Sequence, residues 1–184
     1  PKIKIVNKKN SGLPAARNTG INLSNTKYIL MLDADDWLRF DALQIFYNFL
    51  EKNKKFNYVY SNIHLADEKR GILKKNYNFF EQLFTNQIPY CIFFRTKIFD
   101  NDFRYDENMK KGFEDWDLNI RLGAKGDFGK CLNKNLFNYN VSKQGMLLNN
   151  TLSNYSQIFR YIRIKNEKIY RYSSIIKNFF KWKN

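Results

Sequence analysis

Histidine and cysteine are scarce in this chain, and their scarcity excludes several kinds of site. His64 is the only histidine in 184 residues, which excludes a zinc site built on several histidines and argues against a Ser–His–Asp triad. Cys91 and Cys131 are the only cysteines and lack metal-ligand spacing, so we expect free thiols in a reducing compartment. No apolar run in the sequence approaches the length of a transmembrane helix.

Acidic residues are also few, because 17 Asp and Glu stand against 32 Lys and Arg, for a formal net charge of +15. Such a charge is compatible with nucleic acid, an anionic membrane surface or an anionic substrate as the partner. Compositional bias explains it equally well, so the charge alone does not decide. The few carboxylates gather in two short stretches, and these stretches are more informative.

The first acidic stretch, Asp33, Asp35 and Asp36, directly follows the apolar run 28–32. A run without alternation predicts a strand that is buried on both faces, as in a parallel sheet. Ligands gather at the carboxyl ends of such strands. Clustered carboxylates repel one another unless a cation compensates, and oxygen ligands of this kind suit Mg²⁺ or Mn²⁺. Helix capping by Asp36 or Asp41 is the simpler alternative, but it explains only one carboxylate.

The second acidic stretch, Glu114, Asp115 and Asp117, lies at the start of a predicted helix over residues 115–122. Carboxylates are common at helix N-termini because the free backbone N–H groups favour anions. This stretch is therefore weak evidence when taken alone. Together with the first stretch, it suggests one acidic group for a metal and another for base catalysis.

Strands and helices alternate along the chain, which predicts an α/β fold. We expect strands at residues 2–6, 28–32, 58–60, 88–94 and within 128–141. Helices are expected at residues 14–25, 41–52, 79–84 and 115–122, and a hairpin turn near 67–71.

From residue 152 onward the chain becomes strongly basic, with Glu167 as its only acid. Apolar residues recur there near helical spacing, at Ile158, Ile162, Ile169, Tyr172, Ile176 and Phe179. A basic helix with an apolar face is typical of a segment that lies on an anionic membrane. A helix that packs on the domain and shows a solvated basic face has the same pattern. Both interpretations remain open from the sequence.

Short motifs occur in a fixed order at residues 10–20, 28–37, 105–107 and 112–118, reading NSGLPAARNTG, YILMLDADDW, YDE and GFEDWDL. In their order and approximate spacing they resemble glycosyltransferase family 2, the inverting enzymes of the GT-A fold. The resemblance implies a Rossmann-like α/β fold with a mixed, mainly parallel sheet flanked by helices. Residues 1–150 would be a partial catalytic domain and residues 151–184 a C-terminal basic amphipathic helical tail.

The resemblance also implies roles for single residues. It assigns catalysis to Asp115 and Glu114, metal binding to Asp35, acceptor binding to Trp116, and donor contacts to Asp33, Gly12, Arg17 and Asn18. The implied reaction transfers a sugar, with inversion, from a nucleotide-diphospho-sugar to a saccharide or lipid-linked acceptor. A UDP-sugar is the expected donor and Mn²⁺ or Mg²⁺ the expected cofactor. Synthesis of a bacterial surface polysaccharide or glycolipid is expected, in the cytoplasm or on the inner face of the plasma membrane.

The match to the family fails in two places. Nothing corresponds to the family's N-terminal nucleotide-binding strands, so we expect a fragment with little activity of its own. Many family members have a metal-binding histidine near the end of the catalytic domain, and residues 139–142 contain none. The metal would then be coordinated by Asp35, donor phosphates and water. A non-catalytic scaffold homologue and a basic nucleic-acid-binding module are the alternatives. Nucleic acid is not expected, because the acidic stretches would repel phosphate.

Overall fold

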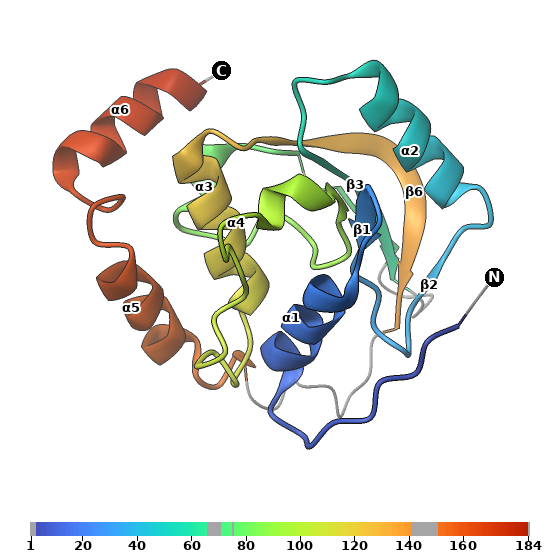
Figure 1. Ribbon diagram of the computed structural model, residues 1–184. Helices are drawn as coiled ribbons and strands as arrows, with labels where there is room; N and C mark the ends of the chain where they lie inside the picture. Colours follow the sequence, from blue (N-terminus) through green and yellow to red (C-terminus); the bar gives the residue numbers. More distant parts are fainter. Residues whose placement is uncertain (1–2, 66–70, 75, 141–150, 184) are drawn as a thin grey trace.

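The computed structural model describes residues 3–65, 71–74, 76–140 and 151–183. In these ranges a six-stranded sheet has the order β1-β5-β3-β6-β2, and β4 pairs with β3 (Figure 1). The strands are β1 (Tyr28–Leu30), β2 (Trp37–Leu38), β3 (Tyr58–Leu65), β4 (Ile72–Leu73), β5 (Phe93–Arg95) and β6 (Gly129–Tyr139). The helices are α1 (Leu13–Leu23), α2 (Ala42–Lys52), α3 (Phe79–Gln82), α4 (Glu114–Lys125), α5 (Tyr155–Lys165) and α6 (Tyr172–Trp182), with a 3₁₀ turn at Thr96–Phe99.

The sheet is mixed, as expected, but it is not mainly parallel. β3 and β6 pair in parallel, whereas β1 with β5, β3 with β5, β3 with β4 and β2 with β6 pair antiparallel. The prediction of a mainly parallel sheet was wrong because burial on both faces removes the alternation of apolar residues whatever the strand direction. β1 and β3 both run antiparallel to β5 and therefore point the same way, so the turn after β1 still opens at the sheet's carboxyl edge.

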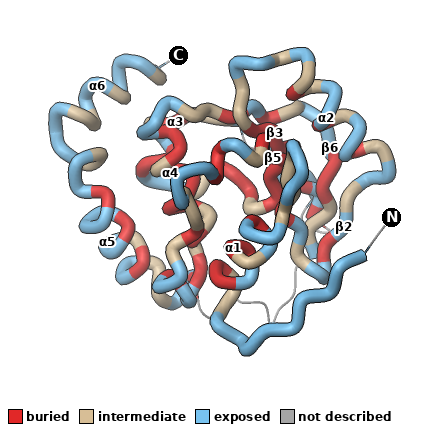
Figure 2. Tube along the Cα trace, in the orientation of Figure 1, coloured by how far each residue is buried: buried red, intermediate tan, exposed pale blue. Residues whose placement is uncertain are grey.

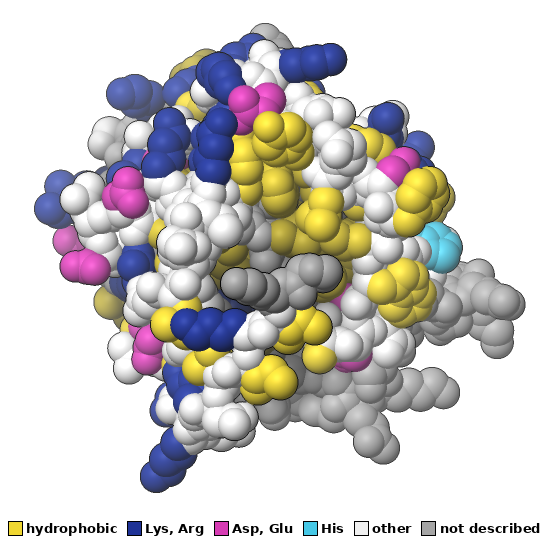
Figure 3. All heavy atoms as spheres, turned by 45° about the vertical axis from the view of Figure 1, so that its right-hand side comes forward, with side chains coloured by type: hydrophobic (Ala, Val, Ile, Leu, Met, Phe, Trp, Pro, Cys, Tyr) yellow, Lys and Arg dark blue, Asp and Glu magenta, His cyan; other side chains and the backbone are white. Residues whose placement is uncertain are grey.

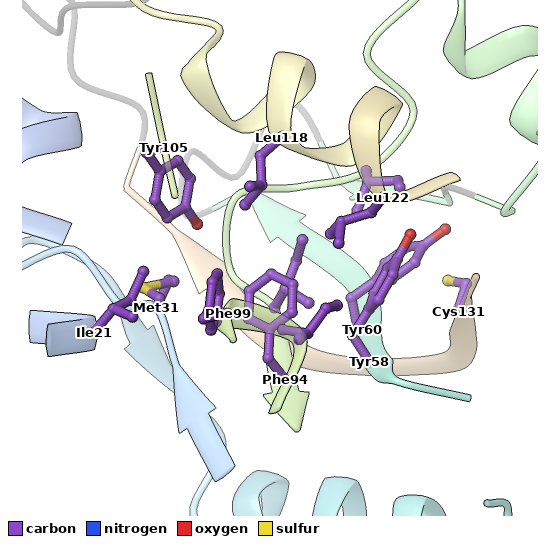
Figure 4. Packing of buried hydrophobic residues seen from close by; sticks show 13 residues of the cluster. Ile21, Met31, Tyr58, Tyr60, Phe94, Phe99, Tyr105, Leu118, Leu122 and Cys131 are labelled. Atoms are coloured by element: carbon purple, nitrogen blue, oxygen red, sulfur yellow. The ribbon is translucent and has the colours of Figure 1, made fainter. Parts of the chain in front are cut away.

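Helices cover both faces of the sheet, and successive residues of β3 show which helix lies on each face. Val59 packs with Phe46 and Leu50 of α2. Tyr58 and Tyr60 point to the other face, where they join a cluster that includes Leu118 and Leu122 of α4 and Ile21 of α1 (Figure 4). The alternation follows from the two-residue period of a strand. Figure 2 shows the resulting buried centre between α2 and α4.

The basic C-terminal stretch forms two helices, α5 and α6, outside α3 and α4 (Figure 1). Ile158 and Ile162 of α5 are buried in a cluster with Trp116 and Ile120 of α4. This half of the apolar stripe is therefore core. The division of the chain at residue 150 stays a prediction.

An ion-pair network also ties α5 to α4. Lys165 Nζ lies 2.8 Å from the Asp117 carboxylate and 2.6 Å from that of Asp106. Asn166 donates a hydrogen bond to the other Asp117 oxygen at 2.9 Å. Asp117 is fully buried, so its charge requires these partners.

Several local predictions need correction. Residues 3–6 form no strand and are exposed, because none of the described strands lies beside them to complete a hydrogen-bonded ladder. Asp41 occupies the N-cap position of α2, but its side chain pairs with Arg39 and caps nothing. β3 and β4 form the expected hairpin, and its turn lies outside the described residues.

None of the helices in the described residues combines the length and the apolarity that crossing a membrane requires.

The surface charge is not gathered into a groove on the face that Figure 3 brings forward. Hydrophobic side chains gather in the middle of that face, and lysines and arginines lie mostly near its margins. Exposed hydrophobic residues of the chain include Phe40, Leu43 and Tyr47, around the start of α2. The described residues of this face therefore offer no continuous basic track for a nucleic-acid strand.

Candidate functional site

Arg17 joins the two acidic stretches in space. Its Nη1 donates to Glu114 Oε1 at 2.5 Å, and its Nη2 donates to Asp33 Oδ1 at 3.1 Å. The Arg17 and Glu114 side chains are only 7% and 4% exposed, whereas that of Asp33 is 31% exposed. The guanidinium also lies over the Tyr90 ring, 4.8 Å from its centroid. One buried cation thus connects the two acidic stretches, although Arg17 and Glu114 are 97 positions apart in the sequence.

The start of α1 sets the position of Arg17. Gly12 is the N-cap residue, with a φ of 94° that favours glycine. Its N–H donates to the Asn10 side chain at 3.0 Å, which closes the preceding turn. Pro14 suits the first helical turn because it lacks an N–H to satisfy. Arg17, one turn later, is directed into the interior.

Asn18 fastens a second segment to the site. Its amide nitrogen donates to the Tyr105 carbonyl and to Glu107 Oε1, both at 2.9 Å, and its oxygen accepts from the Tyr105 N–H at 2.9 Å. Asn18 is buried, and these bonds engage both ends of its amide. Both ends of the Asn18 amide are thus engaged within the protein, and its expected contact with the nucleotide-sugar stays a prediction.

Tyr90 holds the turn that follows β1. Its hydroxyl accepts a hydrogen bond from the Asp33 N–H at 3.1 Å and donates to the Asp36 carboxylate. Asp36 also accepts from the Asn140 N–H at 2.7 Å. Burial raises the pKa of Asp36, while the bonds from Tyr90 and Asn140 oppose that rise. Asp36 therefore acts as the internal anchor of the turn and leaves Asp35 pointing to solvent.

Asp35 is exposed and makes no hydrogen bond or ion pair with the described residues. Within the same residues, no group of three or more His, Cys, Asp or Glu side chains is arranged to hold a metal ion. Mg²⁺, however, commonly takes one or two carboxylates and completes its shell with phosphate oxygens and water. Asp35, with the half-buried Asp33 beside it, fits such a partial site. The metal would then depend on a bound diphosphate.

Glu114 and Asp115 form a carboxylate pair at the first turn of α4. Burial and the adjacent Asp115 raise the pKa of Glu114 to about 7, although Arg17 lowers it. Desolvation also raises the pKa of Asp115, and the opposing groups are Arg17 and Asn86, whose amide donates to Asp115 Oδ2 at 3.2 Å. The pair thus retains a proton to higher pH than free carboxyl groups do. Asp115 is half-buried as a residue.

The backbone before this pair has left-handed conformations. Gly112 has a φ of 107°, and Phe113, the N-cap residue of α4, has a φ of 60°. A bulky residue rarely adopts such a φ, and strain of this kind clusters at functional sites. Phe113 is held in place by ring contacts with Trp116 and Tyr155, whose centroids lie 5.2 and 5.7 Å away.

Trp116 cannot contact an acceptor in this conformation, and the prediction that it does needs correction. Its side chain is fully buried, and its indole N–H donates to the Gln82 carbonyl at 2.6 Å. The ring stacks on Phe159 of α5 at a centroid distance of 5.3 Å. On α4, Trp116 points toward the α5 side, away from the neighbouring pair of carboxylates. It is a core residue that anchors α5.

A hollow of about 760 Å³ lies between α1 and β1 and reaches the acidic turn. Its wall includes Ala16, Gly20 and Ile29, and its polar end includes Arg17, Asp33 and Asp35. Gly20 contributes open space, because a Cβ at this position would meet nothing within 4 Å. The exposed Asp35 thus lies at one end of the hollow.

Sequence reasoning missed Tyr90 and Asn86 as site residues. Both lie in the segment between α3 and β5, which has no charged residue near the contact points. Tyr90 precedes the apolar run that ends in β5, and that position beside a strand was the one available signal. Only the fold brings its hydroxyl to Asp33 and Asp36.

The fold has the GT-A architecture, a mixed sheet flanked by helices. Among solved structures, the fold is similar to that of S. aureus TarS in complex with UDP-GlcNAc, with a TM-score of 0.67 at 15% identity over 89% of this chain and 49% of that one. TarS in complex with UDP matches with a TM-score of 0.61 at 17% identity, over 84% of this chain and 45% of that one.

The family model described as glycosyl transferase family 2 matches residues 1–110. An uncharacterized glycosyltransferase of Methanocaldococcus jannaschii is 28% identical over 99% of this chain and 60% of its own length. The chondroitin synthase of Escherichia coli is 27% identical over 75% of this chain and 21% of its own length. The chain belongs to glycosyltransferase family 2. It spans less than two thirds of these relatives, 60% of the archaeal one.

Proposed function

We propose that these residues form the reaction centre of an inverting hexosyltransferase that uses a nucleotide-diphospho-sugar, with a UDP-sugar as the donor. The observation that carries the proposal is the Arg17 bridge, which brings Asp33 and the Glu114–Asp115 pair to one site. The similarity to TarS structures that hold UDP and UDP-GlcNAc supports the choice of donor. The similarity to chondroitin synthase supports a polysaccharide or glycolipid as the product.

In this mechanism Asp115 is the general base. It accepts the proton of an acceptor hydroxyl as that oxygen attacks the anomeric carbon. The new bond to the acceptor forms as the bond to the phosphate oxygen breaks, so the nucleoside diphosphate leaves and the anomeric centre inverts. A base whose pKa is raised toward neutrality suits this role, and general bases typically contribute about 10²- to 10⁴-fold in rate. Arg17 compensates the negative charge of Glu114, the residue next to the proposed base.

The donor side of the site is proposed to use Asp33 and Asp35. Asp35 would hold Mn²⁺ or Mg²⁺ together with the donor diphosphate, and Asp33 would face the nucleotide. A divalent cation there would stabilise the negative charge that develops on the leaving diphosphate. Gly12 and Arg17 are proposed to shape this side by fixing the start of α1. The acceptor, saccharide or lipid-linked, would reach Asp115 from the solvent side.

We place the reaction in the cytoplasm of a bacterium, at the inner face of the plasma membrane. The strongly basic C-terminal helices support this location, because anionic lipids are abundant in that leaflet.

Calorimetric titration of UDP, with Mn²⁺ and with EDTA, tests the donor proposal. We would titrate this chain and a version to which the expected N-terminal strands have been added. Metal-dependent binding that is lost in Asp35→Asn, but kept in Asp100→Asn at an exposed control position, is the expected result. Absence of binding in both versions, for UDP and for other nucleoside diphosphates, would refute the proposal.

A further inference from the structure

The outer side of α6 carries an apolar stripe that the protein core does not use. Tyr172, Ile176 and Phe180 recur every four residues, so they lie on one side of the helix. Their exposed fractions are 80%, 37% and 70%. No residue of α6 is buried, and Figure 2 shows the helix coloured as exposed and intermediate along its length. A stripe of large apolar side chains in water indicates a binding surface.

The opposite side of α6 is attached to the domain, which fixes the direction of the stripe. Trp182 packs against Phe128 and Tyr77, with centroid distances of 5.1 and 5.4 Å. Phe179, seven residues after Tyr172, lies at the edge of the stripe and packs against Phe80 at 5.3 Å. The Trp182 carbonyl accepts a hydrogen bond from Asn78 at 3.1 Å. Because these contacts occupy the inner side, the stripe faces away from the protein.

Basic residues flank the stripe. Lys177 and Lys181 follow it along one side of α6, and Lys168 and Arg171 precede the helix. α5 adds an exposed apolar residue, Ile164 (64%), and the exposed basic residues Arg160 and Arg163. The described part of this surface carries one acid, Glu167, whose carboxylate lies 3.8 Å from Arg171. Apolar and positive groups therefore share one face.

We propose that the outer face of α5 and α6 binds an anionic lipid surface, with α6 lying in the plane of the membrane. The stripe would enter the boundary between headgroups and acyl chains, while the flanking lysines and arginines contact lipid phosphates. Charge selects this occupant over a second copy of the chain, because two such faces would bring like charges together. The inference does not rest on the proposed sugar transfer, since it uses no residue of that site.

Flotation with vesicles of phosphatidylcholine, with and without phosphatidylglycerol, tests this inference on the intact chain. One variant, Ile176→Ser with Phe180→Ser, removes the stripe, and Phe40→Ser removes an aromatic that is 97% exposed elsewhere. A second variant, Lys168→Gln with Lys177→Gln, is matched by Lys52→Gln with Lys130→Gln at exposed positions outside the surface. All substituted side chains are exposed, so thermal unfolding should be unchanged and serves as the check on folding.

We expect the wild type to float with phosphatidylglycerol vesicles and to remain in solution with phosphatidylcholine alone. The stripe variant should partition at least about tenfold less, from the loss of buried apolar area. The lysine variant should lose about 25-fold, since each basic residue near an anionic surface contributes about fivefold. Both control variants should bind like the wild type.

Three results would overturn the inference. The first is a wild type that fails to float, and the second is a stripe variant that floats as well as the wild type. The third is self-association of the wild type in sedimentation that the stripe variant abolishes without a change in flotation. Unchanged UDP binding in the stripe variant would separate this surface from the sugar-transfer site.

Discussion

Removing the Arg17 guanidinium should destabilise the protein far more than removing an exposed arginine. In Arg17→Met, the buried Glu114 carboxylate loses its cation, and Asp33 loses its link to α1. Breaking a buried ion pair from one side typically costs about 3–5 kcal/mol of unfolding free energy, because an uncompensated charge stays buried. For a domain of this size, such a cost lowers Tm by about 6–20 °C.

The matched control is Arg39→Met. Arg39 also pairs with an aspartate at 2.5 Å, but the two side chains are 42% and 34% exposed. Exposed pairs contribute about 0–1 kcal/mol, so its Tm should fall by no more than about 4 °C. Urea unfolding followed by circular dichroism, together with thermal melts of both variants, measures the difference.

A double-mutant cycle with Glu114→Gln isolates the pair. The double variant Arg17→Met with Glu114→Gln should be less destabilised than the sum of the single variants, because the neutral amide no longer needs the cation. Additive free energies, or a cost for Arg17→Met no larger than that for Arg39→Met, would refute the assignment of Arg17 as the buried bridge.

Three further results are expected. Tyr90→Phe leaves the Asp33 N–H and the Asp36 carboxylate without their shared hydroxyl; urea unfolding should show a loss of about 1–3 kcal/mol, and unchanged stability would contradict the anchoring role. In the version with the added N-terminal strands, Asp115→Asn should lower sugar transfer by about 10²- to 10⁴-fold while UDP titration is unchanged. The rate of the unsubstituted version should rise with pH through the raised pKa of Asp115, because only the ionised form accepts a proton. Glu114, whose folded-state pKa is raised to about 7, should make the protein lose stability as pH rises from about 4.5 to 7. Chemical unfolding at several pH values should show a smaller loss in Glu114→Gln, in which the raised pKa values of Asp115 and Asp36 still contribute.

The sequence was informative where local chemistry determines structure. The apolar run before Asp33 predicted a strand with an acidic turn, and the structure has β1 followed by that turn. The strand is shorter than predicted, and its three residues are half-buried rather than buried on both faces. The acidic start of α4 was likewise visible, because helix starts depend on nearby residues. The predicted end at residue 122 was three residues short, since the helix continues through Gly123 to Lys125 and Gly126 is its C-cap.

Contacts between distant segments were beyond such reasoning. Tyr90 reaches Asp33 across 57 positions, and nothing near Tyr90 in the sequence specifies that contact. Strand direction was misjudged because a strand buried on both faces has the same composition in either direction. Ile162 on α5 and Ile176 on α6 fit one helical stripe equally well, yet the first is fully buried and the second is 37% exposed. The sequence pattern does not distinguish the two residues, and only the packing of α5 on α4 shows that Ile162 belongs to the core.

The first turn of α4 faces two ways, and this has a mechanical consequence. Glu114 and Asp115 contact Arg17 and Asn86, while the next two residues, Trp116 and Asp117, are held by α5 through a stacked ring and a buried ion pair. The backbone hydrogen bonds of a helical turn make it a rigid unit, so the side that contacts α5 and the side that carries the carboxylate pair move together. The packing of α5 on Trp116 and Asp117 therefore contributes to holding the Glu114–Asp115 pair where it is.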